Sequence, residues 1–213
     1  MAIAGNVAKW EIKRNRVSFG KKTIMLSDKD KTENIEKSFR YWKKRLEENP
    51  HEQWIQGKFN KMGSERKAFF AQCKTEAAKK LIKSLNGKRF VCFTGGITQA
   101  DEIGKERAIH GKKTKKHNES TLYKFNNKEI NDVYLNKMGN EGLNLTDIEV
   151  VIIIQLGTGK DDNLSVIQKG GRAMRSMYPE IYILYFKNTK DEEWLNKALE
   201  EYDKKWVKTL VIW

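Results

Sequence analysis

The stretch Phe90-Val91-Cys92-Phe93-Thr94-Gly95-Gly96 joins a continuous apolar run to a glycine turn. An apolar run without polar alternation is typical of a strand that is covered on both faces. Similar runs follow at residues 133–135, 150–154, 181–186 and 210–213, with a marginal one at 108–109. Helical patterns lie between them, at residues 99–107, 118–126, 165–177 and 191–202. Strands that alternate with helices form βαβ units, so the sequence predicts an α/β domain with a mainly parallel sheet.

Two helices are predicted ahead of this region. The first, residues 31–48, has apolar side chains at helical spacing and ends at Asn49-Pro50. The second, residues 64–85, begins at a possible cap, Ser64, and ends at Asn86-Gly87. The first 28 residues show no strong pattern. We therefore expect an N-terminal lead-in and helix over residues 1–63 and an α/β lobe over residues 64–213.

The composition favours a polyanionic partner. The 213 residues include 42 Lys and Arg against 28 Asp and Glu, a net charge of +14. Nucleic acid fits such a charge, because phosphate contacts dominate its binding, and six tryptophans offer stacking faces. A basic surface that serves solubility alone is the alternative.

Other classes of protein are excluded or disfavoured. The two cysteines form no CxxC pair, which excludes a disulfide framework and a cysteine-based zinc site, and no metal site is predicted. Apolar runs stay far below the ~18 residues of a membrane span, so we expect no membrane association. No signal-peptide pattern opens the sequence. We expect a protein that is not secreted, in the cytoplasm of a bacterial or phage-infected cell or in a nucleus.

Three loops after predicted strands could carry chemistry, since ligands of parallel sheets bind beyond the carboxyl ends of strands. Thr94-Gly95-Gly96 could offer backbone amides to a phosphate, or could be a simple tight turn. The glycine-rich residues 136–145 could let a ligand approach the backbone, or could be an ordinary loop. Arg172 and Arg175 lie three apart on a predicted helix, where paired guanidiniums suit a polyphosphate. A solvated basic face is the alternative for this pair.

Taken in order, residues 90–96, 139–145 and 168–175 resemble helicase motifs IV, V and VI. The motif VI pattern Q-x-x-G-R-x-x-R is filled by Gln168, Gly171, Arg172 and Arg175. Over about residues 65–202, the chain resembles the second RecA-like lobe, or C-terminal helicase domain, of a superfamily 2 DNA or RNA helicase or translocase of the phage or repair type. The resemblance implies a three-layer RecA-like domain with a mainly parallel sheet, preceded by a helical N-terminal extension.

The resemblance also implies roles for individual residues. Arg172 and Arg175 would be catalytic arginine fingers that reach the γ-phosphate of ATP held by a first lobe. The implied ATP-binding residues are Gln168, Gly171, Gly142 and Asn144, the last in place of an Asp found in many relatives. The implied nucleic-acid-binding residues are Thr94, Gly95, Asn136, Lys112 and Lys113. The lysines could equally form a solvated loop.

The sequence lacks the parts that a first lobe supplies. Gly157-Thr158-Gly159-Lys160 imitates a phosphate loop, but position 154 is not glycine and Asp161 follows the lysine. Asp101-Glu102 and Asp191-Glu192 imitate a DExx box, but both fall on predicted helices, and we expect surface carboxylates. Without Walker A and B motifs, the chain alone is expected to hydrolyse no ATP, and ATP and Mg²⁺ would bind only together with a first lobe.

The predicted function is therefore the second lobe of an ATP-dependent helicase, an ATP hydrolase whose first lobe is supplied in cis or in trans. DNA is the expected polymer rather than RNA. Two alternatives stay open. The chain could be a stand-alone, non-catalytic nucleic-acid-binding protein derived from such a lobe, or a basic α/β domain whose motif matches are accidental.

Overall fold

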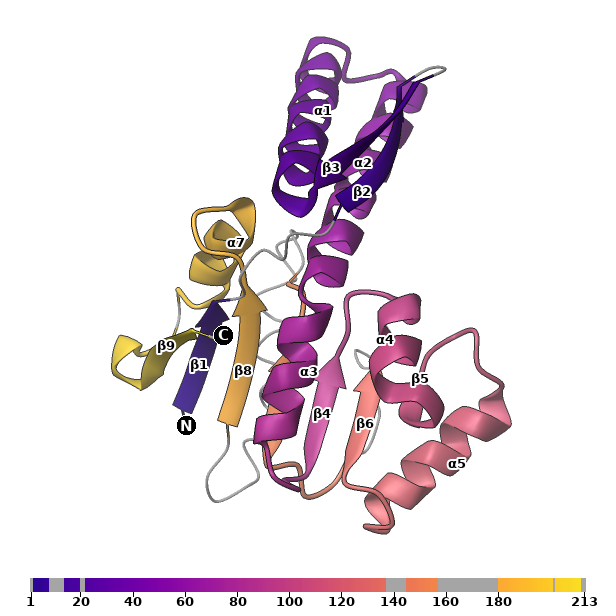
Figure 1. Ribbon diagram of the computed structural model, residues 1–213, viewed down its shortest axis with the longest axis vertical. Coiled ribbons are helices and arrows are strands. Elements are labelled where there is room, and N and C mark those ends of the chain that lie inside the picture. The colour runs from indigo at the N-terminus through magenta and orange to yellow at the C-terminus, as the bar shows by residue number, and fades with distance from the viewer. Residues whose placement is uncertain are drawn as a thin grey trace. The chain divides into compact units, whose positions relative to one another are not determined.

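A computed structural model describes residues 2–7, 14–19, 22–136, 145–156, 180–200 and 202–211 (Figure 1). The chain divides into two compact units. One, here called the hairpin unit, is Trp10–Cys73; the other, the sheet unit, combines Met1–Lys9 with Lys74–Trp213. The expected boundary between residues 63 and 64 therefore falls inside the hairpin unit, and the first nine residues group with the sheet.

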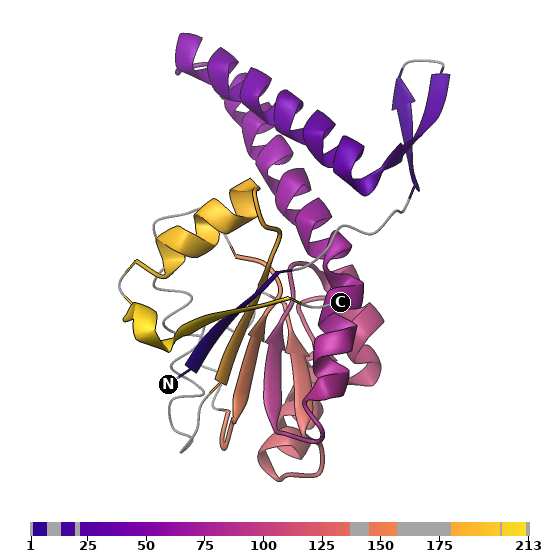
Figure 2. The same cartoon turned by 60° about the vertical axis from the view of Figure 1, so that its left-hand side comes forward.

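The sheet unit is built on a parallel sheet of seven strands among the described residues, in the order β5-β6-β4-β7-β8-β1-β9. The strands are β1 (Ala2–Val7), β4 (Phe90–Phe93), β5 (Ala108–Ile109), β6 (Asp132–Leu135), β7 (Val150–Ile153), β8 (Glu180–Tyr185) and β9 (Val207–Val211). The mainly parallel α/β fold predicted from the apolar runs is confirmed. β1 was not predicted; it lies between β8 and β9, with Ile3 opposite both Ile181 and Val207 (Figure 2).

Helices cover both faces of this sheet (Figure 2). They are α3 (Thr75–Ser84), α4 (Ile97–Gly104), α5 (Lys115–Asn126) and α7 (Lys190–Ala198), with short 3₁₀ turns η1 (Lys105–Arg107) and η3 (Lys204–Trp206). Side chains alternate across each strand. Thus Phe90 and Cys92 pack with α3 and α4, whereas Val91 and Phe93 share a cluster with α5 and α7. Every residue of β4, β6 and β7 is buried, as expected for doubly covered strands.

The hairpin unit contains β2 (Arg14–Phe19) paired antiparallel with β3 (Lys22–Ser27), followed by α1 (Asp28–Glu48) and α2 (Gln53–Cys73). Ser27 caps α1, because its hydroxyl accepts a hydrogen bond from the amide of Asp30 at 3.1 Å. Asn49 and Pro50 end α1 as predicted. The helix predicted over residues 64–85 is wrong as a single element: α2 begins at Gln53, and α3 starts anew at Thr75.

Two further features bear on function. None of the helices in the described part of the chain is long and apolar enough to cross a membrane. Within the same residues, no group of three or more His, Cys, Asp or Glu side chains could hold a metal ion.

Candidate functional site

The carboxyl ends of β4 and β6 bring Thr94 and Asn136 together. The amide of Thr94 donates to the carbonyl of Leu135 at 2.9 Å, and the Asn136 side-chain amide donates to the carbonyl of Thr94 at 3.1 Å. The backbone amide of Asn136 in turn donates to Ile109 at 3.1 Å. Thr94 and Asn136 are both buried. Their side chains therefore fix the turn after β4, and a ligand at this edge would meet the backbone of that turn.

The next two residues begin α4 without a capping side chain. Gly96 is the N-cap residue of α4, and no side chain caps the helix there. Gly95 donates its amide to the side chain of Gln99 at 2.9 Å, and Gln99 donates to the Thr75 hydroxyl at 3.0 Å. A side chain at position 96 would meet nothing within 4 Å. The start of α4 is thus open, and the amides of a helix start favour an anion such as phosphate.

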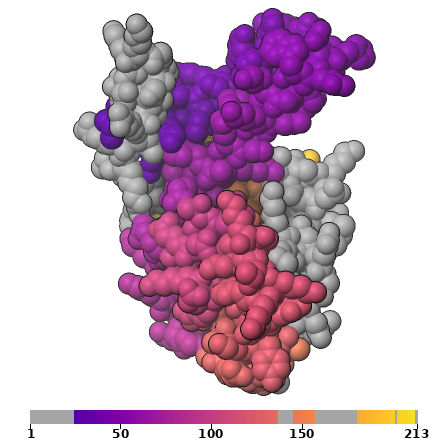
Figure 3. Space-filling view, turned by 90° about the vertical axis from the view of Figure 1, so that its right-hand side faces the viewer, coloured from indigo at the N-terminus to yellow at the C-terminus, as the bar shows by residue number. Residues whose placement is uncertain are grey.

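The predicted lysine pair lies in the loop between β5 and α5. Figure 3 shows the face of the sheet unit to which this part of the chain contributes. Lys112 is exposed, whereas Lys113 is half-buried and lies 3.6 Å from the carboxylate of Asp101. The buried ring of His110 contacts the same carboxylate at 2.9 Å. This hydrogen bond, with smaller contributions from the charges of His110 and Lys113, lowers the pKa of Asp101. The two lysines are therefore unlike: Lys112 faces solvent, while Lys113 has a carboxylate partner.

The residues predicted to contact ATP lie outside the part of the chain that the structure describes. They are the predicted arginine fingers, Arg172 and Arg175, and the predicted ATP-binding residues Gly142, Asn144, Gln168 and Gly171. The structure describes residues that are close to them in sequence. Residues 145–156 follow the predicted motif V, and Glu180, the first residue of β8, comes after the predicted motif VI.

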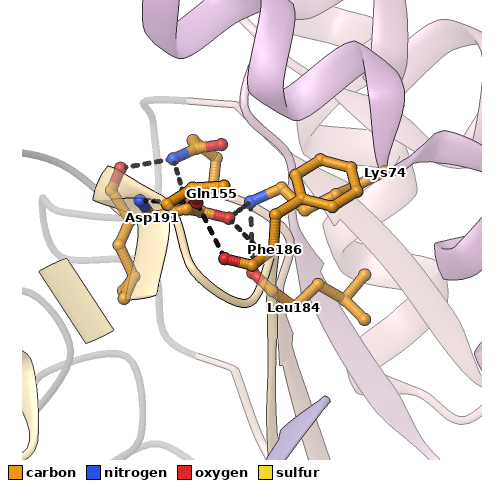
Figure 4. Close-up of polar contacts among 7 residues, drawn as sticks. Lys74, Gln155, Leu184, Phe186 and Asp191 are labelled. Carbon is orange, nitrogen blue, oxygen red and sulfur yellow. Dashed lines mark hydrogen bonds and ion pairs between the residues drawn. The ribbon is translucent and has the colours of Figure 1, made fainter. Parts of the chain in front are cut away.

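A buried ion pair between Lys74 and Asp191 was missed from the sequence (Figure 4). The ammonium of Lys74, at the start of α3, donates to the Asp191 carboxylate at 2.8 Å and to the carbonyl of Leu184 at 3.1 Å. The same carboxylate accepts from the amide of Phe186 at 3.0 Å and from the side chain of Gln155 at 3.0 Å. Lys74 and Asp191 are 0% and 1% exposed.

The prediction that Asp191 is a surface carboxylate is therefore wrong, although it does lie in the first turn of a helix. Burial of a charge is tolerated only where it is paired and hydrogen-bonded, and Lys74 supplies the pairing from 117 residues away. Asp101, by contrast, keeps 44% of its side chain exposed, and Glu102 is exposed, as predicted.

This ion pair positions the end of β7. Gln155 lies two residues after the end of β7, and its side-chain amide donates to Asp191 and to the carbonyl of Leu156, at 3.0 Å in each case. Motif VI begins only 13 residues later, at Gln168. The pair thus anchors the start of α3, the start of α7 and the residues after β7 to one another. A sequence signal existed in Lys74 itself, a charged residue that lies four residues from each of the apolar residues Phe70 and Ala78.

Comparison with known proteins adds a family and a fold. Residues 69–177 match the family described as the helicase conserved C-terminal domain. No curated protein has a sequence that matches the chain. The solved C-terminal domain of the DEAD-box protein Dbp5 is similar in structure, with a TM-score of 0.53 and 16% identity, over 65% of this chain and 86% of that domain.

A larger solved structure is also similar. S. cerevisiae Dbp5 bound to RNA and ADP BeF3 gives a TM-score of 0.57 at 12% identity, and the match covers 67% of this chain. The match covers only 39% of that Dbp5 chain. Together these similarities show the RecA-like fold that the motif pattern implied.

Proposed function

We propose a motor function from the premise that the chain belongs to the helicase conserved C-terminal domain family of superfamily 2, which it matches over residues 69–177. In this proposal, the sheet unit is the second RecA-like lobe of an ATP-dependent nucleic-acid helicase or translocase. The observation that carries the proposal is the complete Q-x-x-G-R-x-x-R motif at residues 168–175, which lies inside the matched region.

Arg172 and Arg175 are the proposed arginine fingers. A planar guanidinium that is always charged can make two parallel hydrogen bonds to phosphate oxygens, and it stabilises charge that develops as the γ-phosphoryl group is transferred. A binding protein without ATP chemistry would gain nothing from two such residues at this spacing. Gln168, Gly171, Gly142 and Asn144 are proposed to line the nucleotide on the same side.

The nucleic-acid groove is proposed to run along the carboxyl ends of β4, β5 and β6. Support comes from the open start of α4 and from Lys112, which is exposed. Thr94 and Asn136 shape this edge through their hydrogen bonds to each other and to neighbouring backbone, and Gly95 through its hydrogen bond to the side chain of Gln99. Binding through phosphates predicts weak, sequence-tolerant affinity that falls steeply as salt rises. DNA as the preferred polymer stays a prediction, as does the phage or repair type.

ATP and Mg²⁺ are proposed to bind only where a first lobe joins this one. The chain carries six Gly-Lys pairs, none followed directly by Ser or Thr, so the phosphate loop must come from that lobe, in cis or in trans. The isolated chain is therefore expected to hydrolyse no ATP above background, with or without nucleic acid.

The test combines the chain with its first lobe and compares wild type with Arg175→Ala and Arg175→Lys. Loss of an arginine finger should lower nucleic-acid-stimulated hydrolysis by about 10³- to 10⁵-fold while leaving nucleic-acid affinity within a few-fold. Lysine should rescue little, because it lacks the planar fork. Lys160→Ala serves as the control and should leave hydrolysis unchanged. Hydrolysis that survives Arg175→Ala would reject the motor role and favour the stand-alone binding protein.

A further inference from the structure

The helical pair of the hairpin unit exposes large aromatic side chains. Tyr41 is 57% exposed and Trp54 is 55% exposed. Tyr41 lies near the end of α1 and Trp54 near the start of α2, and the two helices pack side by side (Figure 2). Isolated exposed apolar residues are ordinary, but large exposed rings on both helices of one pair call for a reason.

Trp42 joins the two exposed rings into one cluster. Its ring centroid lies 5.2 Å from that of Tyr41 and 6.0 Å from that of Trp54, with interplanar angles of 80° and 84°. These are edge-to-face contacts, which fix the orientation of rings without stacking them flat on one another. Trp42 itself is half-buried. The cluster is therefore a supported aromatic surface in which Tyr41 and Trp54 remain open to solvent.

Positive charge surrounds this aromatic cluster. The hairpin unit, residues 10–73, contains 16 Lys and Arg against 9 Asp and Glu, so 64 residues carry +7 of the total +14. Lys37 and Arg45 lie four residues from Tyr41 along α1, and Lys58 lies four residues from Trp54 along α2. Residues at this spacing are neighbours on a helix surface. In the described part of the chain, these three cations form no salt bridge.

We propose that Tyr41, Trp42 and Trp54 form a binding site for single-stranded nucleic acid, in which bases stack on the two exposed rings and phosphates contact Lys37, Arg45 and Lys58. Aromatic platforms inside a basic surface bind unpaired strands, because every base has a π-face and every linkage carries a phosphate. A duplex hides its base faces, and an apolar protein surface would leave the three cations without partners. The cluster lies outside residues 69–177, so none of its residues belongs to the family-matched region or to motif VI.

The experiment measures binding of a fluorescein-labelled oligo(dT) of about 20 nucleotides to the full chain by anisotropy at low salt. Trp54→Ala and Tyr41→Ala should each weaken binding by about 5- to 100-fold, the effect of losing one stacked base. Trp54→Phe should keep most of the affinity, because a phenyl ring still stacks. Matched controls are Trp206→Ala and Tyr123→Ala, which remove rings that are 50% and 67% exposed in the sheet unit and should leave affinity within two-fold.

Further measurements separate this site from the proposed groove. Lys58→Ala should remove one phosphate contact. The plot of log affinity against log salt concentration should therefore become less steep by about one. Oligo(dT) binding is measured without ATP and without a first lobe, so failure of the motor proposal would not imitate failure here. Helix content by circular dichroism confirms that each variant is folded. The proposal would be overturned if Trp54→Ala and Tyr41→Ala both bound oligo(dT) with wild-type affinity. It would also be overturned if the control variants lost as much affinity for oligo(dT), or if the same variants lost as much affinity for a duplex of matched length.

Discussion

The two units of this chain use their apolar residues in opposite ways. In the sheet unit, whole strands are buried, and two clusters of buried side chains line the two faces of the sheet. Among the side chains that the structure describes, the hairpin unit buries four hydrophobic residues, namely Ile55, Phe70, Ala71 and Cys73. It relies instead on half-buried rings such as Phe39 and Phe59, whose centroids lie 4.9 Å apart.

Each unit also buries an arginine against an aromatic ring. In the hairpin unit, the guanidinium of Arg66 stacks over Phe39 at 3.8 Å and pairs with Glu36. In the sheet unit, Arg89 is buried against Phe125 and donates to four backbone carbonyls. The comparison teaches that the sheet unit builds a large core from its apolar strands, whereas the hairpin unit buries few apolar side chains. Both units keep large rings exposed, Tyr123 and Trp206 in the sheet unit and Tyr41 and Trp54 in the hairpin unit. Three substitutions test how far this contrast extends.

The largest expected effect comes from the buried pair in the sheet unit. Asp191→Leu removes the partner of the Lys74 ammonium and should lower the free energy of unfolding by about 3–5 kcal/mol, because an uncompensated charge stays buried. The double variant Lys74→Met with Asp191→Leu should recover most of that loss, since apolar groups of similar volume replace both charges. Urea unfolding followed by circular dichroism measures both.

A surface pair provides the control for this result. Glu102→Gln breaks the contact between Glu102 and Lys79, whose side chains are 37% and 34% exposed, and should cost under about 1 kcal/mol. If Asp191→Leu unfolds at the same urea concentration as Glu102→Gln, the ion pair does not hold the sheet unit together.

The second expected effect concerns packing between α4 and the sheet. An added Cβ at Gly104 would lie 2.5–2.8 Å from three atoms of the Tyr134 side chain. That ring is buried against Phe90, and its hydroxyl donates to Asp132 at 2.7 Å, so it has little room to move. Gly104→Ala should therefore lower the free energy of unfolding by about 1–3 kcal/mol. A melting temperature equal to that of wild type would show that this core accommodates the methyl group.

The smallest effect has the opposite sign and belongs to the hairpin unit. Gly57 lies within α2, and an added Cβ there would meet nothing within 4 Å. Gly57→Ala should stabilise α2 by about 0.5–1 kcal/mol, because alanine loses less backbone entropy in a helix. Slower hydrogen exchange of α2 amides would measure the gain. Faster exchange would mean that the hairpin unit packs more tightly than its few buried side chains indicate.

Much of the sheet unit could be predicted from sequence because its strands are continuous apolar runs. The runs at Phe90 and Val150 lie within one residue of β4 and β7, and the Ala108–Ile109 run matches β5. β1 was missed because Ala2–Val7 contains small and polar residues, and it becomes a strand only through its pairing with β8 and β9. Long-range partners of this kind leave no local pattern.

The candidate site likewise has one part that the sequence predicts and another that it does not. The meeting of Thr94 and Asn136 follows from a general rule, since carboxyl ends of parallel strands share one edge. The burial of Asp191 follows from no local rule, because Lys74 is remote in sequence, and a charged residue in a helix usually faces solvent. Lys74 also lies between the end of α2 and the start of α3. Apolar residues recur at intervals of four across this point, so their spacing predicted one continuous helix.

The place of β1 in the sheet sets an order for folding. β1 comes first along the chain, yet its two neighbours, β8 and β9, come last. Contacts between segments so far apart require closure of a long loop and form slowly. The α1–α2 pair and the β2–β3 ribbon join segments adjacent in sequence, so they can form during synthesis, before β8 and β9 are available to pair with β1. Of the strands that the structure describes, Ala2–Val7 is therefore synthesised before all the others and is among the last to find its place.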